Sequence, residues 1–136
     1  MIVKYSLCLP VKNLPPRYQP RLKVRFHRGI FAFPSLALVD SGADVTILNK
    51  RHAHRLGLHW DKGIEAPLNG ICGDEERMFI YELEISVADL PNSRRKSLVG
   101  FVDLKNVDVL LGQIGFFEHY TVEFRHGDRE FEVKIP

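Results

Sequence analysis

Short apolar or alternating runs, separated by turn-forming residues, fill most of this 136-residue sequence and constrain its fold more than any other feature. Residues 21–26 put Leu22, Val24 and Phe26 on one face of an extended segment and basic residues on the other, which is typical of a half-buried strand. This pattern predicts a mainly β fold that closes into a barrel. Further strands are predicted at residues 1–6, 30–33, 36–39, 45–48, 78–87, 98–102, 107–111, 121–124 and 130–135.

Helix signals are few. Asn49 is a suitable N-cap for a short helix over residues 50–56, and Gly57 is suited to end it. Residues 116–119 have the composition of one further helical turn. We therefore expect one or two short helices beside the strands.

The length of the chain fits a single domain. Prolines punctuate the first part of the sequence, so residues 1–20 are predicted to form an extended N-terminal arm and residues 21–136 the folded domain. Residues 63–73 lack a strand pattern and are predicted to be loop-like. The prolines of the arm are Pro10, Pro15, Pro16 and Pro20.

Composition argues against several classes of protein. The chain is 45% hydrophobic and 26% charged with a net charge of only +2, so nothing favours nucleic acid or an anionic membrane as a partner. No apolar run approaches the length of a membrane span, and the first residues lack a signal-peptide pattern. Cys8 and Cys72 are far apart and match no metal-site spacing, which favours a reducing compartment, and we expect a cytoplasmic location.

Residues 38–48 have the sequence LVDSGADVTIL, in which a small acidic turn interrupts two apolar runs. Asp-Ser-Gly alone is usually only a turn. Here apolar residues run directly into Asp40 and directly away from Asp44, so the turn is anchored in the core at both ends. An aspartate in that position needs hydrogen-bond partners. It is a candidate catalytic carboxylate.

The segment from Asp40 to Ala43 with its apolar flanks resembles the active-site loop of retropepsin-like aspartic proteases, whose pattern is two apolar residues, Asp, Thr or Ser, Gly and Ala. A second marker of that family is two apolar residues and a glycine near the C-terminus, which Leu110, Leu111 and Gly112 match. A third is a glycine-bearing flap hairpin between the two. The sequence is most similar to small single-domain prokaryotic members, and the resemblance implies one acid-protease lobe from about residue 21 onward.

The flap would be centred on Gly70, Ile71, Cys72 and Gly73, followed by the alternating strand from Met78. The resemblance implies that this hairpin bends at its glycines and closes over the substrate. The spacing of these glycines differs from that of the viral flap.

The resemblance also implies roles for the loop residues. Asp40 would be catalytic, Ser41 would hydrogen-bond across a dimer axis, and Gly42 would leave room for the substrate backbone. Together with Ala43, Asp44 would border the bound peptide or meet an intersubunit partner. Leu110, Leu111 and Gly112 would support the loop from below.

The sequence contains a single Asp-Ser-Gly, and no second Asp-Ser-Gly or Asp-Thr-Gly. Residues 61–63 have lysine in the middle position. Two facing carboxylates that share one proton need a second copy of the chain, so an active enzyme must be a homodimer with Asp40 of each subunit at the axis. The expected activity is hydrolysis of peptide bonds without metal or cofactor.

Two departures from the family pattern, the spacing of the flap glycines and the residue at position 113, leave alternatives open. Viral members carry arginine after the second glycine, where it braces the acidic residue of Gly-Ala-Asp, and this chain has Gln113. Asp44 must then find another cation or an amide partner. A second hypothesis is a binding or scaffolding module that keeps the fold without cutting peptides. A third is a domain that dimerises only after the proline-rich arm is trimmed.

Three histidines raise the alternative of a metal site, because His52 and His54 lie on the predicted helix with His59 nearby. Residues two apart on a helix face different directions. No cysteine or carboxylate joins them in a metal-ligand spacing. A solvated helix face explains them better.

Overall fold

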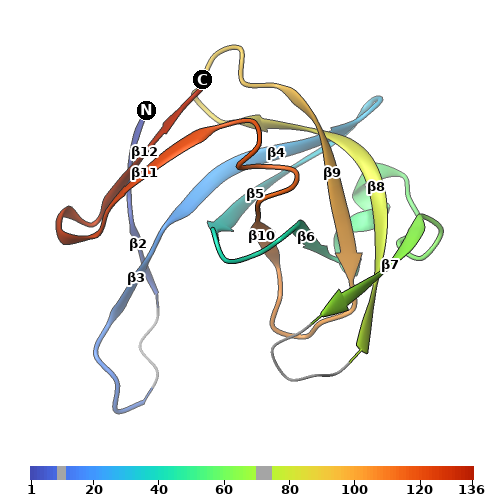
Figure 1. The fold of residues 1–136 in the computed structure, drawn as a ribbon, viewed down its shortest axis with the longest axis horizontal. Coiled ribbons are helices and arrows are strands. Elements are labelled where there is room, and N and C mark those ends of the chain that lie inside the picture. Colours follow the sequence, from blue (N-terminus) through green and yellow to red (C-terminus); the bar gives the residue numbers. More distant parts are fainter. Residues whose placement is uncertain (9–11, 70–74) are drawn as a thin grey trace.

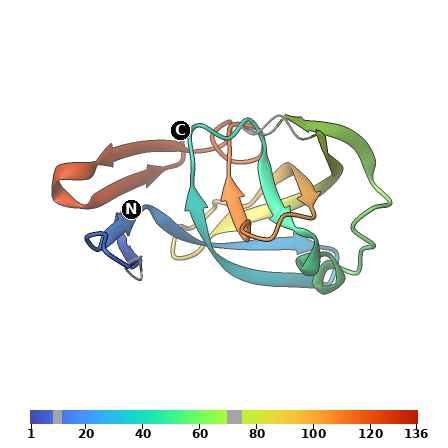
Figure 2. The same cartoon turned by 90° about the horizontal axis from the view of Figure 1, so that it is seen from below.

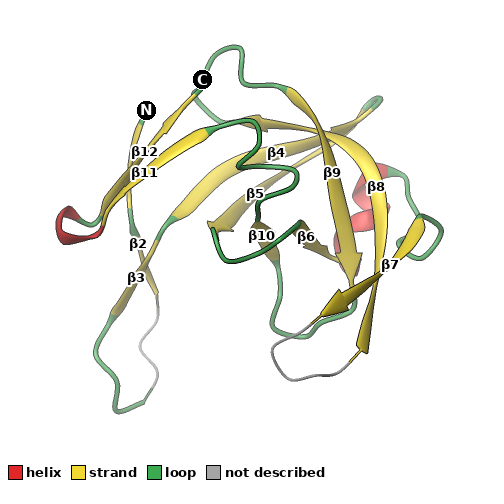
Figure 3. Cartoon of the chain, viewed as in Figure 1, coloured by secondary structure: helices red, strands yellow, loops and turns green. Residues whose placement is uncertain are grey.

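The computed structural model describes residues 1–8, 12–69 and 75–136, and strands dominate that part of the chain (Figures 1 and 3). The strands are β1 (Ile2–Lys4), β2 (Ser6–Cys8), β3 (Arg17–Gln19), β4 (Arg21–Arg28), β5 (Phe31–Val39), β6 (Thr46–Asn49), β7 (Ile64–Asn69), β8 (Glu75–Val87), β9 (Arg95–Val102), β10 (Val109–Leu111), β11 (Thr121–Arg125) and β12 (Glu130–Lys134). Two short 3-10 helices, η1 (Lys50–Leu56) and η2 (His126–Asp128), complete the described elements.

The largest sheet closes into a barrel. Its strand order is β4-β5-β10-β6-β9-β8, and β4 also pairs with β8, which completes the ring, while β7 is added beyond β8. Most pairs are antiparallel, but β5 runs parallel to β10 and β6 runs parallel to β9. The predicted mainly β, barrel-like fold is confirmed.

Alternation along the strands builds the core as predicted. Leu22, Val24 and Phe26 of β4 are buried, and the basic residues between them are exposed. Facing side chains from β5, β8 and β9 pack against them, including Phe33, Ile85 and Phe101. Burial of this apolar surface is the main term that stabilises the barrel.

The two ends of the chain meet in a second sheet of order β1-β12-β11 (Figure 1). The amino group of Met1 donates to the carbonyl oxygen of Val133 at 2.9 Å, and Val3 and Tyr5 pack against the core. Strands β2 and β3 form a separate hairpin. The division between an arm of residues 1–20 and a domain of residues 21–136 stays a prediction.

Two strand assignments differ from the sequence pattern because of proline. Residues 64–69, predicted as loop, form β7, which carries Pro67 at the outer edge of the sheet, where a missing N–H is tolerated. The two runs predicted at residues 30–33 and 36–39 form the single strand β5, which begins at Phe31 and continues through Pro34. Because β10 reaches only Leu38 and Val39, Pro34 has a neighbouring strand on one side alone.

The predicted helix after Asn49 is confirmed as η1. The Asn49 side chain accepts a hydrogen bond from the Arg51 amide at 3.1 Å, and Gly57 ends the helix in a left-handed conformation with φ 69°. Residues 116–119 form turns, and the second helix is η2 in the terminal hairpin. Within the described ranges, no helix combines the length and apolar character needed to cross a bilayer.

We expect Phe131→Ala to lower the free energy of unfolding by about 3–5 kcal/mol, because it empties a fully buried site. Phe131 is 0% exposed, and its ring lies 6.0 Å from that of Tyr5 and 6.2 Å from that of Phe124. Urea unfolding followed by circular dichroism measures the change. Ile30→Ala, at a residue 95% exposed, is the control and should change stability by less than about 0.5 kcal/mol. Equal effects would show that burial of the Phe131 ring adds nothing to stability.

Candidate active site

The loop that carries Asp40 starts where two parallel strands end together. Val39 of β5 lies opposite Leu111 of β10, and the Asp40 amide donates to the carbonyl oxygen of Leu111 at 3.0 Å. The Ala43 amide then donates back to the Asp40 carbonyl oxygen at 3.1 Å, which turns the chain toward β6. The backbone of Asp40 is therefore held by β10 through its amide and by its own turn through its carbonyl oxygen.

The Asp40 carboxylate is half-buried at the surface of this loop. Its Oδ1 accepts a hydrogen bond from the Gly42 amide at 3.0 Å, which is the partner that the sequence required. A Cβ atom on residue 42 would lie 3.3 Å from that oxygen, so glycine keeps the approach to the carboxylate open.

The segment after β10 locks onto the Asp40 loop through backbone hydrogen bonds. The Gln113 amide donates to the carbonyl oxygen of Ala43 at 2.8 Å, and the Ile114 amide donates to that of Asp44 at 2.9 Å. A Cβ on Gly112 would lie 2.6 Å and 2.7 Å from the carbonyl oxygens of Val45 and Ala43. Only glycine fits there, so the structure brings Asp40–Asp44 and Leu110–Gly112 into direct contact.

Two buried hydroxyl groups beneath the loop have roles that the sequence analysis did not predict. Thr46 Oγ1 accepts from the Gly112 amide at 3.1 Å, and Ser97 Oγ donates to the Gly115 carbonyl oxygen at 2.6 Å. Gly115 has φ 95°, and its amide donates to Glu118 Oε1 at 2.8 Å. A threonine inside the apolar run of residues 45–48 was the available signal, because a buried hydroxyl must have a partner.

Gln113 occupies the position at which viral members carry arginine. Its side chain contacts Ser41 and not Asp44. Its side-chain amide donates to the carbonyl oxygen of Ser41 at 2.7 Å. In the described part of the chain, the exposed Asp44 carboxylate has neither a hydrogen bond nor an ion pair. The neutral amide of Gln113 thus ties the Asp40 loop to the segment after β10 without involving Asp44.

The proposed flap residues Gly70, Ile71, Cys72 and Gly73 lie outside the described residues. The strands on either side, β7 and β8, pair in antiparallel register from Ile64 opposite Ile80 to Asn69 opposite Glu75. Figure 2 shows the paired ends of β7 and β8 on the side of the barrel that carries the loop between β5 and β6.

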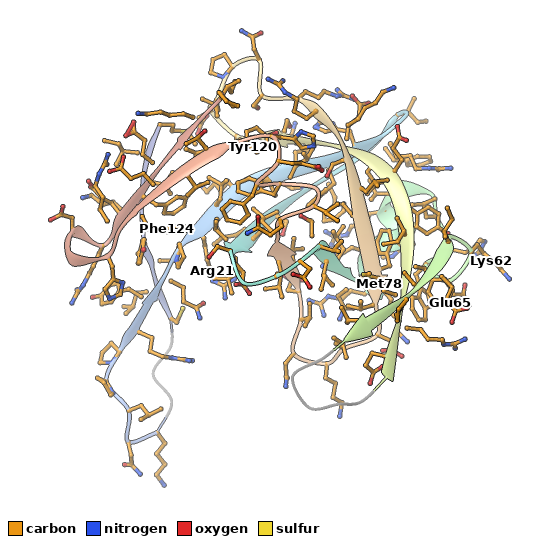
Figure 4. All side chains as sticks on the ribbon, viewed as in Figure 1. Arg21, Lys62, Glu65, Met78, Tyr120 and Phe124 are labelled. Carbon is orange, nitrogen blue, oxygen red and sulfur yellow. The ribbon has the colours of Figure 1, made fainter. Side chains whose placement is uncertain are left out.

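A second apolar cluster, separate from the main core, fills the space between this hairpin and β6. Its buried members are Ile47, Met78 and Val102. Met78 points inward from β8 (Figure 4), and a side chain on Gly100 would collide with it. The partly buried members are Val45, Ala66, Leu68, Ile80, Leu104, Val107 and Leu110. These side chains offer an apolar wall beside the loop.

The histidines do not form a metal site in the described residues, where no three His, Cys, Asp or Glu side chains cluster. His52 Nε2 lies 2.5 Å from Asp108 Oδ1, and its ring stacks on Phe33. Burial raises the pKa of Asp108, but hydrogen bonds from His52 and Arg51 outweigh it, so the pKa is lowered overall. This pair fastens η1 to the segment before β10.

No family model matches the sequence, and no curated protein matches it. Solved structures do match. A retropepsin-like aspartic protease from Rickettsia conorii is 15% identical over 97% of this chain and 99% of that chain, with a TM-score of 0.59. The EIAV protease in complex with the inhibitor HBY-793 is 21% identical over 69% of this chain and 81% of that chain, with a TM-score of 0.49.

The chain has the fold of one lobe of a retropepsin-like aspartic protease. The likeness to the Rickettsia structure extends over almost the whole of both chains. The fold expected from residues 40–44 and 110–112 is thus confirmed.

We expect Thr46→Val to lower the free energy of unfolding by about 1–3 kcal/mol, because it leaves the buried Gly112 amide without an acceptor. Urea unfolding of the purified chain measures the loss. Thr121→Val, on an exposed position of β11, makes the same chemical change without an observed side-chain bond and should cost less than about 0.5 kcal/mol. Similar values for both variants would rule out a supporting role for the Thr46 hydroxyl.

Proposed function

We propose that this protein is an aspartic endopeptidase that acts as a homodimer, with Asp40 of each subunit at the twofold axis. The observation that carries the proposal is the set of backbone hydrogen bonds between residues 40–44 and the segment 111–114. These bonds hold the turn that presents the half-buried Asp40 at the surface. The protease name of the Rickettsia structure with the same fold supports this function.

The second subunit is required by the chemistry. The sequence has one Asp-Ser-Gly, and a single carboxylate cannot be both the base for water and the acid for the scissile carbonyl. Two Asp40 carboxylates at an axis share one proton, because two like charges so close cannot both ionise. Ser41 and Asp44 are exposed in the single chain, which leaves them available to a partner or a substrate.

In this mechanism the ionised Asp40 takes a proton from water while the protonated Asp40 of the other subunit hydrogen-bonds the scissile carbonyl oxygen. Attack of the water gives a tetrahedral intermediate, and the dyad then delivers a proton to the leaving nitrogen. Gly42 leaves room for the peptide backbone beside the carboxylates. No metal or cofactor takes part in the proposed reaction.

The proposed substrate is a peptide or protein segment in extended conformation. An extended segment can add as a strand while alternate side chains enter pockets. The partly buried members of the second apolar cluster, such as Leu68, Ile80 and Leu110, favour apolar side chains next to the cleaved bond. Residues 70–73 are the proposed closing flap. A cytoplasmic location remains a prediction from the spacing of the cysteines.

The alternative is a binding module that keeps the fold but does not cleave peptides. The reason to consider it is that Gln113 stands in place of arginine. The hydrogen bond from Gln113 to the Ser41 carbonyl oxygen shows how an amide can hold the loop without the missing cation. Protease activity is therefore the function that we favour. Trimming of residues 1–20 before dimerisation stays a separate hypothesis, which comparison of chains with and without those residues can test.

We expect Asp40→Asn to reduce peptide cleavage by at least about 10²–10⁴-fold, because the amide cannot act as a base. Fluorescein-labelled casein, assayed from acid to neutral pH, is the probe, and the circular dichroism spectrum should be unchanged. Asp61→Asn, at an exposed turn away from the loop, is the matched control and should keep full activity. Undiminished cleavage by the Asp40→Asn chain would exclude the proposed mechanism, and a wild-type chain that cuts no peptide would favour the binding module.

A further inference from the structure

Strand β12 has no edge left for another chain. Ile2, Val3 and Lys4 of β1 pair with one edge of β12, and residues 121–125 of β11 pair with the other. A strand from a second copy cannot lie beside β12 unless one of these pairings breaks. The terminal sheet can therefore be extended only at the outer edge of β1 or of β11.

Parts of β4 and β5 lie near β1 in the same chain. Residues 1–4 border a hollow of about 470 Å³ whose other wall includes Leu22 and Lys23 of β4 and Leu36 of β5. A strand that paired with β1 would have to enter this space. The edge of β1 is thus a poor place for a second subunit.

Among the described residues no strand pairs with the outer edge of β11, which lies on the side of the molecule that carries the Asp40 loop. Figure 2 shows β11 on the same side as the loop between β5 and β6, with β12 and β1 farther from that side. Figures 1 and 2 both place the sheet to one side of this loop, so an axis at the β11 edge lies nearer the loop than an axis at the β1 edge.

The two faces of β11 are chemically distinct. Val122 and Phe124 lie on the apolar face, and Phe124 remains 39% exposed although its ring is near Phe131 (Figure 4). Glu123 and Arg125 lie on the charged face, where Arg125 bonds Glu123 at 3.0 Å and Glu132 at 2.9 Å. An open edge with an exposed aromatic residue is a site for strand addition.

We propose that a second copy of this chain pairs its β11 antiparallel to β11, centred on Phe124, so that the two three-stranded sheets become one continuous sheet. In this register the two Phe124 side chains face each other on the apolar face. Glu123 of each chain lies opposite Arg125 of the other, so the register is complementary in charge. The proposal deepens the proposed function and rests on it in one respect, which is that the shared axis brings the two Asp40 carboxylates together.

Charge reversal at these two positions tests the register. Glu123→Arg sets two arginines opposite each other at two places in the dimer, and Arg125→Glu sets two glutamates opposite each other. Each variant alone should raise the dimer dissociation constant at least about tenfold. A mixture of the two variants restores opposite charges at both places, so it should form a heterodimer at concentrations where neither variant dimerises alone.

Sedimentation velocity over a range of concentrations measures the dissociation constants. Lys4→Glu, which breaks the 2.7 Å pair with Glu130 at the opposite edge of the sheet, is the matched control and should leave dimerisation unchanged. Arg125→Glu also removes the pair with Glu132, so thermal unfolding must show that this variant is folded. Glu123→Arg keeps that pair and tests the register even if Arg125→Glu does not fold.

The results separate this inference from the proposed function, because sedimentation does not depend on cleavage. If the wild-type dimer persists in Glu123→Arg, or if the mixture does not associate, the inference is overturned whatever the activity. If the charge variants behave as expected but casein is not cut, the interface stands and the proposed activity fails. A wild-type chain that stays monomeric at every concentration overturns the inference, and the casein assay of wild-type and Asp40→Asn chains then decides separately on the activity.

Discussion

The parallel pairing of β5 with β10, and the backbone hydrogen bonds that follow it, form the constraint on which the rest of this structure depends. They join Asp40 to Leu111, Ala43 to Gln113 and Asp44 to Ile114, so two loops far apart in the sequence become one rigid unit. The close approach leaves no space for a side chain at Gly112. The backbone that carries the Asp40 carboxylate keeps one position, because several hydrogen bonds must break together before it can move.

Stability and function are divided between the two sides of this unit. Beneath it, the hydroxyl groups of Thr46 and Ser97 satisfy backbone groups that would otherwise be buried without partners. Above it, Ser41, Asp44 and the half-buried Asp40 carboxylate face outward. The buried side resembles the interior of a stable domain, and the outward side resembles half of a site. A second copy that docks along β11 would supply the other half of the site. The barrel would then carry the carboxylate, and the terminal sheet would form the interface.

Much of this architecture could be predicted from local sequence. Alternation located β4 and β8, and Asn49 and Gly57 bounded η1, because each signal acts over a few neighbouring residues. The strand β7 was missed because Pro67 and short length weaken the pattern, and only the pairing with β8 makes it a strand. The partner of Gln113 was also beyond reach, since Ser41 is distant in sequence and the amide contacts its backbone, which leaves no trace in residue type. The flap residues remain a sequence-based prediction.

The sequence by itself determined that this protein is a mainly β barrel and that Asp40 is the carboxylate to consider, because periodicity and an acidic turn between apolar runs are local properties of the chain. Only the tertiary structure decided which strands became neighbours. It joined the Asp40 loop to residues 112–114, it enclosed β12 between β1 and β11, and it left the outer edge of β11 without a partner among the described strands. These outcomes depend on hydrogen bonds between segments far apart in the chain, and a composition or a spacing does not encode such pairings.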